Sequence, residues 1–444
     1  MKPTSHEVEG VTEEKAILVS LVTDDLRWTA EMAKHSLNEL INLAETAGLE
    51  VLGVITQNRE TADSKWFIGK GKAEEVKQMV IQTGANIVVF DQELSGAQVR
   101  NLEELLDAKI IDRTQLILDI FAQRAKTREG ILQVELAHLS YLLPRLSGQG
   151  KNLSRQGGGV GTRFGGGETK LETDRRHIRE RISTLKRQLQ EVVRLRNLHR
   201  ERRKKTGVFQ VALVGYTNAG KSTLLKQLTQ ADVYVENKLF ATLDPTSRNL
   251  TLPGGKEIVV TDTVGFIQNL PHDLIAAFRA TLEEANEADL ILHVVDSSSE
   301  MRDEQMRVVG EVLRELGAHD KETVTLFNKV DRIDENERNL LTAPGEYLRL
   351  SALNEGDLEA LQALLEHKLS GGVARFRIPA DKGDLIALAY RIGTVQDSAV
   401  DEDDMVLSVR LDSADSQKFG GPLAPYRDGS PSAAPVSQTT SELE

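Results

Sequence analysis

The sequence contains no cysteine, and this absence excludes disulfide bonds, thiolate catalysis and cysteine-ligated metals. Its nine histidines are scattered without the spacing of metal ligands. No uninterrupted apolar run reaches the ~18 residues typical of a membrane-spanning helix. The chain starts with Met-Lys-Pro-Thr-Ser-His-Glu, which lacks the apolar core of a secretory signal. We therefore expect a cytoplasmic protein without a membrane span.

Charge is distributed unevenly along the chain. The 444 residues carry a formal net charge of −13, which by itself argues against nucleic-acid binding. Residues 170–205, however, hold fourteen Lys and Arg against five Asp and Glu, a net charge of +9. A solvated helix face is the usual explanation of such a run. The asymmetry also indicates a basic element that contacts a polyanion, and further features of this segment favour that interpretation.

The most specific pattern is a phosphate-binding loop between an apolar run and a helical pattern. In it, backbone N–H groups and the helix N-terminus point at phosphate oxygens. Lys221 adds a positive charge near the β- and γ-phosphates, and the Ser222 hydroxyl can bind Mg²⁺. The loop and the first residue of the helix are expected to bind nucleotide: Gly215, Tyr216, Thr217, Asn218, Ala219, Gly220, Lys221, Ser222 and Thr223.

Three further patterns follow in the order that a guanine-nucleotide site requires. The apolar strand before Asp262 ends in D-x-x-G, which places a carboxylate on the Mg²⁺ side and the Gly265 amide near the γ-phosphate. In the N-K-x-D pattern, Asp331 accepts from the two guanine donors that adenine lacks. The third pattern is the run Tyr347–Ala352, whose backbone can meet the guanine O6. The expected binding residues here are Asp262, Thr263, Val264, Gly265, Asn328, Lys329, Val330, Asp331, Ser351, Ala352 and Leu353. Together the patterns predict a GTP-binding domain with a doubly wound α/β sheet.

A first switch segment is expected between these patterns, with binding residues Phe240, Ala241, Thr242, Leu243 and Asp244. Thr242 is our choice for the hydroxyl that reaches Mg²⁺ when a γ-phosphate is present, and Thr246 is the rival. The predicted metal ligands are thus Ser222, Thr242 and Asp262, and the predicted catalytic residues are Lys221, Thr242 and Gly265.

Phe266 occupies the position where many GTPases carry a glutamine that orients the attacking water. One explanation is that Phe266 only packs and hydrolysis is slow. The other is that a partner orders the site and completes it. We favour the partner, because the rest of the phosphate machinery is intact.

A helical hairpin is predicted before the GTPase unit. Two leucine-rich stripes have a mean period of 3.5, and between them residues 148–167 contain nine glycines. The second helix is expected over 171–205, about 50 Å at 1.5 Å per residue. The glycine-rich segment can bring backbone close to a phosphate-lined surface. The alternative is a disordered linker, which could still become ordered on binding. The stripes consist of Leu132, Leu136, Leu139, Leu143 and Leu146, and of Ile178, Ile182, Leu185, Leu189 and Val192.

The remaining segments complete an α/β protein with several domains. The first hundred residues have short apolar strands at 16–19, 51–55 and 87–90, separated by helical patterns, which predicts a parallel sheet. A small α+β module is expected after a linker at 371–373. The predicted divisions are 1–13 disordered, 14–112 N-terminal α/β unit, 113–205 helical hairpin, 206–370 GTPase domain, 374–412 C-terminal module and 413–444 disordered tail.

At this point the chain resembles the HflX family of GTPases, a resemblance that covers roughly residues 15–370. It rests on Asp112–Gln123, Leu132–Leu136, Gly158–Arg163, Glu168–Arg176, Phe240–Asp244 and Asp262–Phe266. One departure is Phe164–Gly167, where the family more often has a Gly-Pro-Gly turn. The resemblance implies a GTP hydrolase, with Mg²⁺, that binds rRNA of the large ribosomal subunit through the hairpin, and we expect a monomer.

Three hypotheses of function remain open at this point. The protein is a ribosome-stimulated GTPase that splits or rescues stalled ribosomes, as the resemblance implies. Alternatively, it is a ribosome-assembly GTPase that binds immature particles. The third possibility is a nucleotide-gated RNA-binding switch whose hydrolysis is incidental, which Phe266 leaves open.

Overall fold

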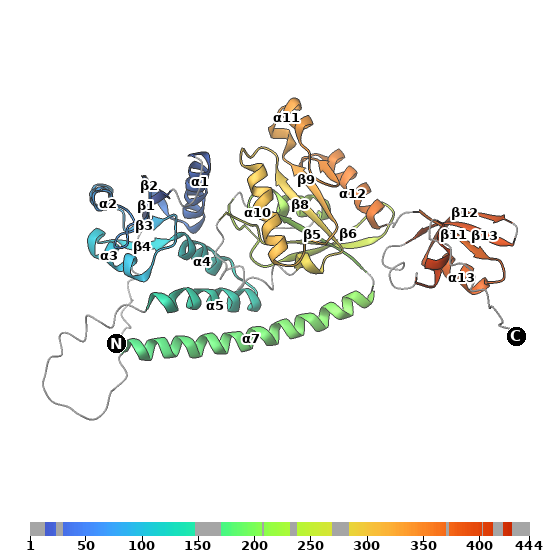
Figure 1. The fold of residues 1–444 in the computed structure, drawn as a ribbon, viewed down its shortest axis with the longest axis horizontal. Helices are drawn as coiled ribbons and strands as arrows, with labels where there is room; N and C mark the ends of the chain where they lie inside the picture. Colours follow the sequence, from blue (N-terminus) through green and yellow to red (C-terminus); the bar gives the residue numbers. More distant parts are fainter. Residues whose placement is uncertain are drawn as a thin grey trace, which may run out of the picture.

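The fold is given by a computed structural model with three separate β-sheets (Figure 1). It describes residues 14–23, 30–146, 170–206, 208–230, 238–268, 284–369, 373–401, 403–411 and 421–428. The predicted disordered start at 1–13 and the glycine-rich segment at 148–167 lie outside these ranges, as does most of the predicted tail.

The N-terminal unit is a four-stranded parallel sheet in the order β2-β1-β3-β4. Its strands are β1 (Lys15–Thr23), β2 (Glu50–Arg59), β3 (Ile87–Phe90) and β4 (Lys109–Asp112), and its helices are α1 (Ala30–Ala47), α2 (Lys70–Thr83) and α3 (Gly96–Leu106). The three predicted strands are confirmed, and β4 is an addition. Helix α4 (Arg113–Arg124) packs its Ile117 and Phe121 against Leu40 of α1, beside this sheet.

A pair of helices runs beneath the two larger sheets (Figure 1). Helix α5 spans Arg128–Arg145 and α7 spans Lys170–Thr206, close to the 171–205 expected from the sequence. Glu135 pairs with Arg181 and Glu129 with Arg196, so the two helices are antiparallel. Most of the predicted stripe residues meet in one apolar seam of Leu132, Leu136, Leu139, Ile182, Leu185, Leu189 and Val192. Leu143, Leu146 and Ile178 do not belong to it.

The central domain has a six-stranded sheet in the order β10-β9-β8-β5-β7-β6. Its strands are β5 (Phe209–Gly215), β6 (Thr246–Thr251), β7 (Glu257–Asp262), β8 (Leu290–Asp296), β9 (Thr323–Asn328) and β10 (Tyr347–Arg349). Its helices are α8 (Lys221–Thr229), α10 (Arg302–Glu315), α11 (Glu335–Leu340) and α12 (Glu355–Leu369). Five strands are parallel, while β6 is antiparallel, so the sheet is mixed.

Both faces of this sheet are covered, as the doubly wound prediction requires. Side chains of a strand alternate between faces. On β5, Val214 packs on the face with Val309 of α10, whereas Leu213 packs on the other face with Leu224 of α8 and Leu365 of α12. Burial on both faces explains why the parallel strands are nearly continuous apolar runs.

The C-terminal module is a three-stranded antiparallel sheet with one helix. It contains β11 (Val373–Pro379), α13 (Gly383–Ile392), β12 (Gly393–Asp401) and β13 (Asp404–Leu411), in the sheet order β11-β13-β12. Val373 starts β11, although the sequence places this residue in a linker. The predicted disordered tail is wrong for residues 421–428, which are ordered against the module. Leu423 in this segment is fully buried and covers apolar side chains of the module's core. The Asp428 N–H also donates to the Arg375 carbonyl of β11.

Candidate functional site

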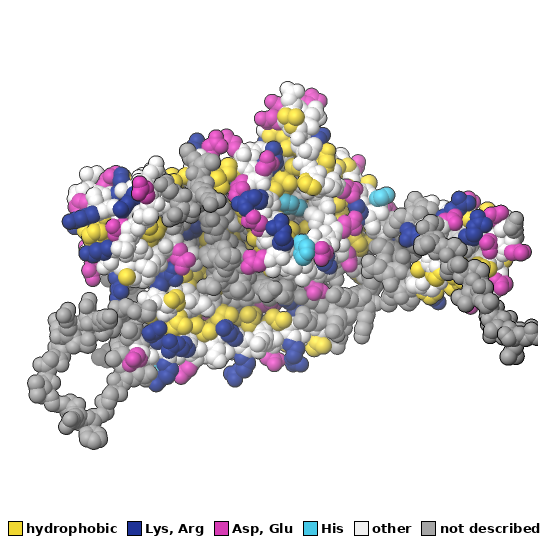
Figure 2. Space-filling model, viewed as in Figure 1, with side chains coloured by type: hydrophobic (Ala, Val, Ile, Leu, Met, Phe, Trp, Pro, Cys, Tyr) yellow, Lys and Arg dark blue, Asp and Glu magenta, His cyan; other side chains and the backbone are white. Residues whose placement is uncertain are grey.

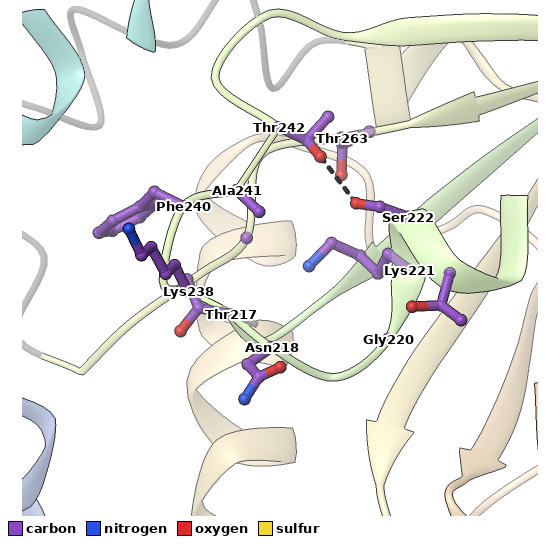
Figure 3. A pocket seen from close by; sticks show the side chains of 12 residues that line it. Thr217, Asn218, Gly220, Lys221, Ser222, Lys238, Phe240, Ala241, Thr242 and Thr263 are labelled. Carbon is purple, nitrogen blue, oxygen red and sulfur yellow. Dashed lines mark hydrogen bonds between the residues drawn. The ribbon is translucent and has the colours of Figure 1, made fainter. Parts of the chain in front are cut away.

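The phosphate-binding loop lies between β5 and α8, as its pattern predicts (Figure 3). Gly220 is the residue before α8 and has φ +97°, a conformation that favours glycine. A Cβ there would lie 2.3 Å from Nδ2 of Asn328. The Asn328 amide also donates to the Ala219 carbonyl at 2.9 Å, so the guanine-side loop is packed directly onto the phosphate loop.

Lys221 is buried in the loop. Its Nζ donates to the carbonyls of Gly215 at 3.0 Å and Tyr216 at 2.9 Å. Burial lowers the pKa of Lys221 to about 8, while the nearby Asp262 carboxylate acts in the opposite direction. A bound phosphate would favour the charged ammonium in the same way, which suits a residue that contacts β- and γ-phosphates.

Side-chain oxygens of Ser222, Thr242 and Asp262 meet at the start of α8. Ser222 Oγ lies 2.7 Å from Asp262 Oδ2. It also lies 2.8 Å from Thr242 Oγ1 (Figure 3). Asp262 is fully buried, and its Oδ1 has no hydrogen-bond partner among the described residues. Burial raises the pKa of Asp262, while Lys221 and Ser222 lower it. A buried, unpaired carboxylate oxygen beside two hydroxyls is a donor set that fits Mg²⁺.

Thr246 lies outside this cluster. It starts β6, and its hydroxyl donates to the Asp244 carbonyl at 3.5 Å. The structure thus brings Thr242, and not its rival, next to Ser222.

The pocket around the phosphate loop is lined by most of the residues that the sequence predicts to contact the phosphates and Mg²⁺. It is lined by Thr217, Asn218, Gly220, Lys221, Ser222, Thr223, Lys238, Phe240, Ala241, Thr242, Thr263 and Gly265. Lys238 is the one lining residue that the sequence analysis missed, since it belongs to no motif. Gly215, Tyr216, Ala219, Leu243, Val264 and Val330 are buried and support the loops instead.

Phe266 is turned into the core, 2% exposed. Its backbone pairs with the phosphate loop, because its N–H donates to the Gly215 carbonyl at 3.2 Å and its carbonyl accepts from Thr217 N–H at 2.7 Å. The side chain is therefore a packing group and has no role in orienting water.

The guanine side is assembled from β9 and the loop after β10. Asn328 Oδ1 accepts from Ala352 N–H at 2.9 Å, and Lys329 Nζ bonds to the Asn218 carbonyl and to Asp296 Oδ2, both at 2.7 Å. These bonds connect the two loops to the phosphate loop. Asp331 and Leu353 are exposed, whereas Ser351 is buried. Asp331 is therefore free to meet an incoming base.

A buried polar network joins the nucleotide site to the N-terminal unit. The Tyr216 hydroxyl donates to Glu39 of α1 at 2.5 Å and accepts from Gln268 N–H at 2.6 Å. Arg113 of α4 bonds to the Gln268 carbonyl at 3.3 Å and pairs with Glu39 and Asp91. All five side chains are at most 6% exposed. Sequence reasoning missed this network.

Within the described ranges, no group of three or more His, Asp or Glu side chains is placed to hold a metal ion. The helices in those ranges are also too short or too polar to cross a membrane.

Protein-family models match three consecutive segments of the chain. A model described as GTP-binding GTPase N-terminal matches residues 34–122, and one described as GTP-binding GTPase Middle Region matches 124–203. A model described as 50S ribosome-binding GTPase matches 210–329. The three segments correspond to the N-terminal unit, the helical pair and most of the central domain.

Individual relatives match over most of the chain. GTPase HflX of Caldanaerobacter subterraneus subsp. tengcongensis is 50% identical over 371 residues, 83% of this chain and 84% of the relative. GTPase HflX of Escherichia coli is 45% identical over 416 residues, 91% and 95% of the two chains. A solved structure of a GTP-binding protein from Sulfolobus solfataricus in complex with GDP covers 79% of this chain and 98% of its own, at 23% identity and a TM-score of 0.43.

Proposed function

The chain belongs to the HflX family of GTPases and is a GTP hydrolase, and on that premise we propose that it splits or rescues stalled ribosomes. It binds the large subunit through the α5–α7 pair and separates the subunits in a GTP-dependent way. We also propose that it acts in the cytoplasm and as a monomer. The E. coli relative, GTPase HflX, matches over nearly the whole chain, which supports a shared GTPase activity.

The observation that carries the proposal is the basic outer face of α7. Figure 2 shows Lys and Arg side chains along the lower edge of the molecule, where α7 lies. Arg176, Arg179, Lys186, Arg187 and Arg194 are exposed there. Such a row suits rRNA phosphates, because each contact releases counterions from the nucleic acid.

We further propose that Mg²⁺ accompanies the nucleotide. Ser222, Thr242 and Asp262 would hold it, and the ion would neutralise charge on the β- and γ-phosphates. Lys221 binds the same phosphates from the loop. Burial raises the pKa of Asp262, and Lys221 and Ser222 oppose that effect. Gly265 would place a backbone N–H near the γ-phosphate.

A sucrose-gradient experiment tests the proposal. Mature 70S ribosomes are incubated with the protein and GDP, GTP or a non-hydrolysable GTP analogue. Splitting predicts free large and small subunits with the GTP forms, and the protein sedimenting with the large subunit. GDP is the matched control and leaves the 70S peak unchanged.

Two other outcomes favour the remaining hypotheses. Intact 70S particles with the protein bound only to immature large subunits would favour an assembly role. Nucleotide-dependent binding to large subunits without splitting or stimulated hydrolysis would favour an RNA-binding switch.

A further inference from the structure

The carboxylate of Asp244 sits at the N-terminus of α5, the first helix of the pair. Its Oδ2 accepts from the backbone N–H groups of Lys126 at 2.8 Å and Thr127 at 2.9 Å. Its Oδ1 accepts from the Thr127 hydroxyl, which in turn accepts from Gly130 N–H at 3.0 Å. A residue of the first switch segment thus caps a helix that lies 117 positions away in sequence. An anion at this end of a helix is stabilised by the free N–H groups and the helix dipole.

The absence of a side chain at Gly130 makes room for the contact between Asp244 and the start of α5. It lies in the first turn of α5, where alanine would be the better helix former. A Cβ at position 130 would lie 2.5 Å from Asp244 Oδ1 and 3.2 Å from the Thr127 hydroxyl oxygen. Glycine therefore leaves the space that the carboxylate occupies.

The switch segment has a second anchor on the N-terminal unit. The ring of Phe240 packs edge-on against Phe121 of α4, with centroids 4.7 Å apart. Phe240 has φ +53°, a conformation that a non-glycine residue adopts only when its surroundings hold it. Figure 3 shows its ring extending away from Ser222, whereas Thr242 faces Ser222. Residues 240–244 therefore contact Ser222 on one side and α4 and α5 on the other.

We propose that Asp244 transmits the state of the nucleotide to the α5–α7 pair. Thr242 and Asp244 are two residues apart, so a nucleotide that holds Thr242 at Ser222 also holds Asp244 on α5. Loss of the γ-phosphate frees Thr242 and with it the cap. Coupling of this kind is reciprocal, so a ligand that fixes α5 in its capped position also favours the ordered switch. The ribosomal part of this inference rests on the proposed function.

Amide hydrogen exchange of the free protein tests the coupling without ribosomes. In the parent protein, the amides of Lys126, Thr127 and Gly130 should exchange about tenfold more slowly with a non-hydrolysable GTP analogue and Mg²⁺ than with GDP, in line with the strength of a helix cap. Asp244→Ala should remove this difference. Gly130→Ala should also reduce it, by displacing the carboxylate while improving helix propensity. Asp334→Ala is the matched control, since Asp334 caps α11 of the same domain.

The second measurement is the ratio of large-subunit dissociation constants with GDP and with the analogue. Asp244→Ala and Gly130→Ala should bring this ratio about tenfold closer to one. A parent that does not bind large subunits refutes the proposed function but leaves the exchange result standing. If both variants keep the nucleotide-dependent exchange of the parent, or if the parent shows none, the coupling through Asp244 is wrong. Should Asp244→Ala not fold, Gly130→Ala decides alone.

Discussion

At the scale of single residues, the Tyr216 hydroxyl links the nucleotide site to the N-terminal unit. It belongs to the phosphate loop, yet it bonds to Glu39 of the N-terminal unit and to the backbone of Gln268 after the D-x-x-G pattern. Burial and the Glu39 carboxylate raise the pKa of Tyr216 well above its usual range, so the hydroxyl stays protonated and keeps donating. One side chain thereby ties three segments together.

We predict that Tyr216→Phe destabilises the protein by about 2–4 kcal/mol, because Glu39 Oε1 and Gln268 N–H lose a buried partner. Denaturant unfolding with and without GDP measures the effect. Tyr390→Phe is the control, since Tyr390 is 54% exposed. Equal stability of the two variants would show that the network contributes little to folding.

A second prediction at this scale concerns the base. Asp331→Asn should weaken GDP binding by ~2–3 kcal/mol, because the carboxylate accepts from both guanine donors and an amide presents a donor to one of them. The same variant should bind xanthine nucleotides better than the parent. Titration with GDP and XDP measures both, and Asp303→Asn, at a side chain 88% exposed, is the control. Unchanged GDP affinity would exclude Asp331 as the base reader.

At the scale of elements, the outer face of α7 is the surface that we propose binds the large subunit. Arg179, Lys186 and Arg187 are exposed on a helix whose opposite stripe is buried against α5. Reversing their charge should therefore change the surface and spare the apolar seam.

We predict that the triple variant Arg179→Glu, Lys186→Glu, Arg187→Glu binds large subunits at least about tenfold more weakly and with a shallower salt dependence. Sedimentation at several salt concentrations measures this, and an unchanged GDP affinity confirms an intact nucleotide site. The control is the triple variant Lys70→Glu, Lys77→Glu, Arg314→Glu, which changes the net charge by the same amount at sites on α2 and α10. Parental binding by the α7 variant would mean that this face is only solvated.

The elements also show what could be predicted from the sequence. Strands such as β3 are continuous apolar runs because both faces are buried, and the phosphate loop has a spacing set by the ligand itself. Strand β6 was missed because Thr-Ser-Arg-Asn-Leu-Thr is a half-exposed antiparallel edge with little apolar signal. The contact between Glu39 and Tyr216 joins residues 177 positions apart, and only tertiary packing specifies it.

At the scale of the whole molecule, α1, α4 and the start of α5 contact the loops that surround the nucleotide site. Glu39 contacts Tyr216 of the phosphate loop, and Arg113 contacts Gln268 in the segment after Gly265. Phe121 and Thr127 contact the first switch segment. A partner that moves the α5–α7 pair therefore acts on the reacting site without touching the nucleotide. This arrangement offers a physical route for the partner that Phe266 led us to expect.

We predict slow hydrolysis by the free protein and an acceleration on the order of a hundredfold by large subunits, comparable to the effect of one positioning group in other enzymes. Phosphate release under single-turnover conditions measures both rates. Lys221→Ala should be inactive in both conditions, and the α7 charge-reversal variant should lose the acceleration, because stimulation requires contact with the basic face. Fast hydrolysis by the free protein, unchanged by large subunits, would mean that the site supplies its own water-positioning group and that the N-terminal unit does not control it.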